Sequence, residues 1–193
     1  MKDIEVLIIN TAEEDDYRFT DPILKAIKDQ QVEANIKHWS ELSGKLSIYP
    51  MDGVIISASP RGDNANFSKR LEVFRWLKTS EKPVFGICAG HQLIGATFGA
   101  DLISNIEKEE GSVRVHILKD DPIFGGLKSG FLTHQDHEDS ISLPPDFVLL
   151  ANSENCRVQA MRHKTKPIYS VQWHAEISNP GLLRNFISQL IIA

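Results

Sequence analysis

Cys88 lies between Gly86 and Gly90 in a Gly-x-Cys-x-Gly pattern. The apolar stretch Val84–Ile87 before it predicts a buried parallel strand, and a helical pattern follows at once over His91–Phe98. This is the thiol counterpart of the Gly-x-Ser-x-Gly nucleophile elbow, whose tight turn leaves no room for a Cβ at either glycine. The N-terminus of the following helix would stabilise a thiolate. We interpret Cys88 as a nucleophile; the alternative is a buried cysteine in a glycine-rich turn.

A second apolar segment, Ile168–Val171, is followed by His174 and Glu176 in a His-x-Glu pattern. In an extended chain residues i and i+2 share a face, so Glu176 can orient His174 while His174 faces the thiol. A cysteine, a histidine and a carboxylate arranged in this way form an activated nucleophile. The alternatives are a strand-end histidine bonded to a carbonyl and a solvated acid in a loop. The presence of both patterns in one chain favours catalysis.

These two segments resemble the two signatures of the class I glutamine amidotransferases. Gly-Ile-Cys-Ala-Gly-His-Gln is similar to the nucleophile signature of that family, and Val-Gln-Trp-His-Ala-Glu is similar to its Val-Gln-Phe-His-Pro-Glu, with Ala175 in place of the proline. The resemblance runs from Ile4 to about Ile192. It implies a glutaminase in which Cys88 attacks the side-chain amide of L-glutamine, His174 transfers protons and Glu176 orients the histidine.

The family resemblance also implies an oxyanion hole made of two backbone N–H groups, those of Ala89 and Ser59. The sequence departs from the family at the second of these. Ser57-Ala58-Ser59-Pro60 stands where the family has Ser-Gly-Gly-Pro, so both glycines are absent. A backbone donor survives a change of side chain only if the loop keeps its shape.

Recognition of the substrate is assigned by the resemblance to Gln92 and Asp136. Gln92 follows the nucleophile by about one helical turn, and the carboxylate of Asp136 would pair with the ammonium of glutamine. A solvated acidic loop is the alternative for the Thr133–Asp139 segment. The spacing of His134 and His137 matches no common structural zinc site, so we expect no metal.

Further segments resemble the branch of the family that serves GMP synthetase as a separate glutaminase subunit. They are Asp121–Leu127, Thr133–Asp136 and the stretch from Leu143 to Met161. This resemblance implies an ATP-binding synthetase partner and xanthosine monophosphate as the acceptor of ammonia. The chain itself carries no nucleotide-binding motif, since Gly125–Gly130 lacks the spacing of a phosphate loop. We therefore expect no cofactor in this chain and place ATP and Mg²⁺ on the partner.

Three alternatives to this function stay open. The first is a glutaminase subunit of another synthase, such as the chorismate-using ones, although Thr-His-Gln-Asp replaces their usual Tyr-His-Ser. The second is a free-standing γ-glutamyl hydrolase that needs no partner. The third is a catalytically silent regulatory module that keeps the fold.

The order of apolar segments predicts the α/β class, with a mostly parallel central sheet covered by helices on both faces. After Asp101 the helical signals become scarce and short β-like segments follow, which indicates a mixed or antiparallel annex. No linker divides residues 1–193, so we expect one domain. The expected strands are 4–10, 32–38, 52–57, 84–87, 113–118, 130–133, 147–151, 158–162 and 168–171; the expected helices are 20–30, 66–79, 91–98 and 182–191.

Composition excludes several other classes of protein. The chain has 193 residues, of which 41% are hydrophobic and 24% charged, and a net charge of −5, so it offers no basic surface for nucleic acid. It shows neither a secretory signal nor an apolar run long enough for a membrane span. Two cysteines form no disulfide framework, and a nucleophilic thiol requires a reducing compartment, so we expect a cytoplasmic protein.

Overall fold

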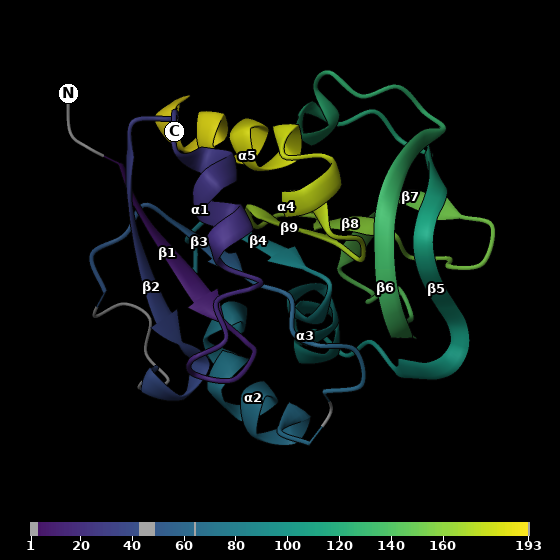
Figure 1. Ribbon diagram of the computed structural model, residues 1–193, viewed down its shortest axis with the longest axis horizontal. Helices are drawn as coiled ribbons and strands as arrows, with labels where there is room; N and C mark the ends of the chain where they lie inside the picture. Colours follow the sequence, from purple (N-terminus) through teal and green to yellow (C-terminus); the bar gives the residue numbers. More distant parts are fainter. Residues whose placement is uncertain (1–3, 43–48, 64, 193) are drawn as a thin grey trace.

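The computed structural model describes residues 4–42, 49–63 and 65–192, which form a single mixed sheet covered by helices (Figure 1). The sheet has the strand order β2-β1-β3-β4-β9-β8-β7-β5-β6. The strands are β1 (Ile4–Asn10), β2 (Val32–His38), β3 (Gly53–Ile56), β4 (Val84–Ile87), β5 (Leu102–Ile117), β6 (Phe131–Ile141), β7 (Phe147–Ser153), β8 (Ala160–His163) and β9 (Ile168–Val171). The helices are α1 (Asp21–Ile27), α2 (Phe67–Val73), α3 (Ala89–Thr97), α4 (Ala175–Ser178) and α5 (Gly181–Ile192), with 3₁₀ turns at Trp39–Glu41, Phe74–Lys78 and Pro122–Phe124.

The inner strands of the parallel half, β1, β3, β4 and β9, lie between two layers of helices, whereas the edge strand β2 is only partly buried. Helices α1, α4 and α5 lie on one face, and α2 and α3 lie on the other (Figure 1). Successive residues of β1 therefore enter different cores: Val6 and Ile8 pack in the cluster that includes Ile23 of α1, whereas Leu7 and Ile9 pack in the cluster that includes Leu93 of α3. This two-sided burial explains why β3 and β4 are uninterrupted apolar runs, whereas polar and apolar residues alternate in the edge strand β2. The predicted fold class is confirmed.

The antiparallel half continues the same sheet, and its strands are longer than predicted. β5 extends over Leu102–Ile117 where only 113–118 was expected, and β6 extends to Ile141 where the strand was expected to end at Thr133. The alternative of a solvated loop at Thr133–Asp139 is therefore wrong. In β6 the buried positions are themselves polar, since Thr133, Gln135, His137 and Asp139 are buried, so no apolar run marks the strand.

Two helices end more than one residue earlier than predicted, and a further helix was missed. α1 ends at Ile27 and not near Gln30, and α2 tightens into a 3₁₀ turn at Phe74. The short helix α4, which begins directly after His174, was missed because four residues give no periodicity to detect. None of the helices in the described part of the chain is long and apolar enough to cross a membrane.

Helix α5 closes one core of the sheet through Phe186, and this contact is open to a stability test. Phe186 is 1% exposed, and its ring centroid lies 5.6 Å from that of Phe85 in β4. We expect Phe186→Ala to lower the free energy of unfolding by about 3–5 kcal/mol, because the packed helix cannot collapse fully into the cavity. Ile191→Ala, on the same helix but 59% exposed, should cost far less. Urea denaturation measures both, and equal losses would contradict this account of the core.

Candidate active site

The site begins at the paired carboxyl ends of β4 and β9. These strands run parallel, with Ile87 opposite Val171, and the backbone N–H of Cys88 donates to the Val171 carbonyl at 2.9 Å. Parallel strands end at the same edge of a sheet. The residue that follows β4 and the segment that follows β9 therefore emerge side by side, which brings Cys88 toward His174.

Cys88 itself has a strained backbone. Its φ is 49° and its ψ is −104°, a conformation that side chains of L-residues rarely adopt. A Cβ at Gly86 would lie 2.9 Å from the Gly90 carbonyl group, and a Cβ at Gly90 would lie 2.5 Å from the Ile56 carbonyl oxygen. The strand–turn–helix elbow thus requires both glycines, as the sequence predicted, and it holds the thiol at the N-terminus of α3.

Gln172 is a site residue that the sequence interpretation missed. It is fully buried, and its Nε2 donates to the Cys88 sulfur at 3.7 Å. A buried amide donor next to the sulfur stabilises negative charge there. The signal for this role was its place two residues before His174, which carries meaning only once the pairing of β4 and β9 is known.

His174 and Glu176 are in contact, although not in the way predicted. His174 Nδ1 donates to Glu176 Oε1 at 2.8 Å, and both side chains are buried. The prediction placed the two on one face of an extended chain. In fact β9 ends at Val171, His174 caps α4, and Glu176 reaches back from the first turn of that helix. The carboxylate fixes the proton on Nδ1 and leaves Nε2 to face Cys88.

The pKa of His174 is raised to about 11. Burial works against a charged ring, but hydrogen bonds and negative charge from Cys88 and Glu176 outweigh it. The imidazole is therefore protonated at neutral pH, as a proton donor to a leaving group must be. By contrast, burial lowers the pKa of His91 in α3 to about 3; its Nδ1 pairs with Ser170 Oγ at 2.8 Å.

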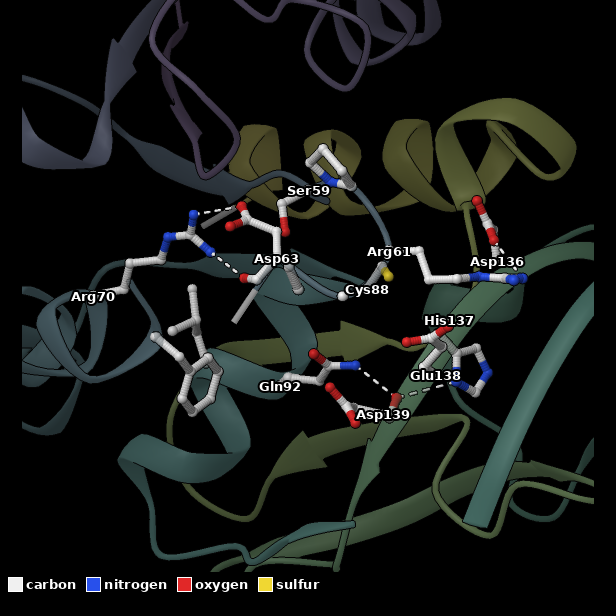
Figure 2. Close-up of a pocket in the computed structure, with 15 residues that line it drawn as sticks. Ser59, Arg61, Asp63, Arg70, Cys88, Gln92, Asp136, His137, Glu138 and Asp139 are labelled. Atoms are coloured by element: carbon white, nitrogen blue, oxygen red, sulfur yellow. Dashed lines mark hydrogen bonds and ion pairs between the residues drawn. The ribbon is translucent and has the colours of Figure 1, made fainter. Parts of the chain in front are cut away.

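The two predicted oxyanion donors lie at the edge of the pocket beside Cys88. Ala89 is the first residue of α3, and Ser59 belongs to the loop after β3. Among the described residues, neither backbone N–H has an acceptor, so both are available to a ligand. Ser59 lines the same pocket as Cys88 (Figure 2).

The loop that carries Ser59 is held by Thr11, which follows β1. The Thr11 N–H donates to Ser57 Oγ at 3.1 Å, and its hydroxyl lies 3.0 Å from the carbonyl oxygens of both Ser57 and Ala58. Ser57, Ala58 and Ser59 all avoid positive φ. The backbone of this loop therefore does not need the two glycines that are absent.

The pocket in front of Cys88 encloses about 400 Å³ including its open mouth. Gln92 lies in its wall, where Nε2 donates to the Asp139 carbonyl at 2.7 Å (Figure 2). The same Nε2 lies 3.4 Å from Gln172 Oε1. Asp136 also lines the pocket, but its Oδ1 pairs with the guanidinium of Arg61 at 2.6 Å. The structure therefore brings both predicted substrate residues to the pocket and adds Arg61, which the sequence interpretation did not single out.

The two histidines of β6 do not share a site. His134 is exposed, whereas His137 is buried and donates from Nδ1 to the Asp139 carbonyl at 3.1 Å. Within residues 4–42, 49–63 and 65–192, no three His, Cys, Asp or Glu side chains are grouped so that they could hold a metal ion.

Comparison with known proteins identifies the family of this chain. The glutamine amidotransferase class-I family matches residues 14–189. The chain belongs to this family. It is 33% identical to a subunit of glutamine-hydrolyzing GMP synthase from Methanosarcina barkeri, over 97% of each chain. It is 39% identical to the subunit of the same name from Pyrococcus abyssi, over 69% of this chain and 73% of that one.

A solved structure shows the same fold. A crystal structure of a GMP synthase subunit from Thermoplasma acidophilum has a TM-score of 0.84 and 28% identity, and the match covers 100% of this chain and 96% of that one. The resemblance seen in the sequence is thereby confirmed at the level of the family and of the class I amidotransferase fold.

In this amidotransferase the protonation of His174 should depend on Cys88. Cys88→Ala removes a hydrogen bond and a negative charge that favour the imidazolium, while the opposing effect of burial remains. We expect the ring of wild-type His174 to stay protonated from about pH 6 to pH 9 and that of the variant to lose its proton within or below that range. Imidazole ¹⁵N chemical shifts measure this, with His174→Gln to assign the signal. A His174 ring that is neutral at pH 7 in the wild type would contradict a protonated imidazole stabilised by Cys88 and Glu176.

Proposed function

We propose that this chain hydrolyses L-glutamine at Cys88 and supplies the ammonia to a synthetase subunit that forms GMP. The observation that carries the proposal is the meeting of Cys88, in its strained elbow, with the buried His174–Glu176 pair at the ends of β4 and β9. The same arrangement supports a mechanism in which each described group has one task.

In the first half of the reaction, the Cys88 sulfur attacks the side-chain amide carbon of glutamine. The N–H groups of Ala89 and Ser59 hold the oxyanion that forms, because both are unpaired among the described residues and lie beside the thiol. Collapse of the tetrahedral intermediate breaks the C–N bond. His174 gives its proton to the departing nitrogen, which leaves as ammonia, and a γ-glutamyl thioester remains on Cys88.

In the second half, His174 is neutral and accepts a proton from water as that water attacks the thioester. The C–S bond breaks, glutamate leaves, and the thiolate and imidazolium are restored. Glu176 keeps the ring in place through both halves, and Gln172 donates to the sulfur when it carries charge.

We infer the partner from the relatives and from the chemistry. Relatives that match nearly the whole chain are named as one subunit of a glutamine-hydrolyzing GMP synthase. We therefore assign ATP and Mg²⁺ to another subunit, with xanthosine monophosphate as acceptor, and no cofactor to this chain. A cytoplasmic location fits a reactive thiol, since neither Cys88 nor Cys156 is in a disulfide.

The proposed roles predict a graded loss of glutaminase activity. Cys88→Ala should abolish it, and His174→Ala should lower kcat by a factor on the order of 100 to 10,000, because the leaving nitrogen receives no proton. Glu176→Gln should retain measurable activity, since a neutral amide oxygen can still accept from Nδ1. Cys156→Ala is the matched control: burial raises the pKa of that thiol, and the change should leave activity intact. An active Cys88→Ala enzyme would refute the mechanism.

The proposed partnership predicts that ammonia release rises when the cognate ATP-dependent synthetase, ATP, Mg²⁺ and xanthosine monophosphate are added. We expect a several-fold increase, measured as glutamate formed. In the complex, Cys88→Ala should block GMP formation from glutamine but not from added ammonium chloride, which separates loss of the glutaminase from loss of assembly. High activity of the isolated chain, unchanged by the synthetase, would favour a free-standing hydrolase.

A further inference from the structure

Arg61 is carried by a hydrogen-bonded turn at the mouth of the pocket. It lies in a β-turn in which the Asp63 N–H donates to the Pro60 carbonyl at 3.1 Å, with Gly62 at a φ of +71°. A turn of this kind needs a positive φ at its third residue, and glycine supplies it. The backbone of Arg61 is therefore held at the tip of this turn.

A second arginine anchors that turn from helix α2. Arg70 is 2% exposed, donates from Nη2 to Asp63 Oδ2 at 2.6 Å and from Nη1 to the Asp63 carbonyl at 3.1 Å. The charge of Arg70 is thus paired with Asp63 inside the protein and is not available to a ligand. Arg61, in contrast, is 30% exposed and points across the pocket toward Asp136 (Figure 2). Of these two pocket-lining arginines, Arg61 is the one that a ligand can reach.

The charges at the mouth are complementary to those of a free amino acid. Arg61 Nη2 lies 2.6 Å from Asp136 Oδ1 and 2.9 Å from Glu110 Oε2. An α-amino acid carries one carboxylate and one ammonium on the same carbon. It can take the place of each partner in the Arg61–Asp136 pair without leaving either charge unpaired, while Glu110, which is 77% exposed, keeps the guanidinium near the mouth.

We propose that Arg61 is a specificity-determining residue that binds the α-carboxylate of the substrate, while Asp136 binds the α-ammonium. This inference rests on the proposed glutaminase function and deepens it. The α-carbon of glutamine is separated from the amide by two methylene groups. Arg61 and Asp136 at the mouth would therefore hold the head group while the amide reaches Cys88. A fork of guanidinium donors matches a carboxylate better than a lysine ammonium does.

The Arg61–Asp136 pairing also explains how the site would distinguish glutamine from amides that lack one of its two charged groups. A γ-amide that lacks the α-carboxylate would have to separate Arg61 from Asp136 and would leave the guanidinium with only the exposed Glu110 as its partner. One that lacks the α-ammonium would separate the same pair without giving Asp136 a new partner. Both leave a charge poorly paired in a narrow pocket, so the zwitterion is favoured over either fragment.

Binding to a Cys88→Ala enzyme tests this without turnover. Calorimetry would compare L-glutamine with 4-aminobutanamide, which lacks the carboxylate, and with glutaramate, which lacks the ammonium. Adding Arg61→Ala should weaken L-glutamine roughly tenfold or more. It should not weaken 4-aminobutanamide, whose ammonium then no longer competes with Arg61 for Asp136. Adding Asp136→Asn should weaken L-glutamine and spare glutaramate. Arg61→Lys should recover part of the loss.

Arg162→Ala is the matched control, because it breaks a 2.9 Å ion pair with Asp121 that lies outside the pocket lining. It should leave all three affinities unchanged. Tighter or unchanged glutamine binding in Arg61→Ala would overturn the inference. It would show that Arg61 only shields Asp136 from the substrate. Equal weakening of 4-aminobutanamide, or no glutamine binding in the Cys88→Ala parent, would also overturn it. Glutamine binding of the expected pattern without hydrolysis by the wild type would instead refute only the proposed function.

Discussion

The parallel pairing of β4 with β9 is the constraint on which the site depends. β9 is the strand where the sheet changes direction, since it runs parallel to β4 and antiparallel to β8. The bond from the Cys88 N–H to the Val171 carbonyl therefore joins the residue that follows β4 to the segment that leads from β9 to His174. A shift of one residue in this register would turn Cys88 away from His174, so the burial that fixes the register of both strands also fixes the site.

The wall opposite Cys88 is held by a buried polar network in the antiparallel half. Glu109 of β5 accepts from Ser153 and Gln159, both at 2.6 Å, and Gln159 in turn accepts from Gln135 of β6 at 2.8 Å. A carboxylate this deeply buried costs free energy unless it is bonded in this way. The network joins strands that are far apart in sequence and fixes β6, whose residues 136–139 line the pocket.

Local patterns in the sequence identified the residues that act within short segments. The elbow around Cys88 and the His174-x-Glu176 pair were visible because each is specified by neighbours one to four residues away. Gln172 and Arg61 were not singled out, since their roles depend on contacts with Cys88 and Asp136, each more than 70 residues distant. The polar strands β5 and β6 were cut short for a related reason, because buried positions such as Glu109 and Gln135 are polar and depend on hydrogen bonds to distant strands.

The loop at Ser57–Pro60 shows why the two glycines of the family pattern are not required for its backbone conformation. Glycine is needed only where φ is positive or where another backbone approaches closely, and Ser57, Ala58 and Ser59 avoid positive φ. What fixes this loop is the buried hydroxyl of Thr11, 3.0 Å from two of its carbonyls. Each carbonyl paired in this way sets the direction of the peptide beyond it. The aim of the Ser59 N–H is thus determined by an anchor at the end of β1 and not by the flexibility of the loop, so the side chains here could change without loss of the donor.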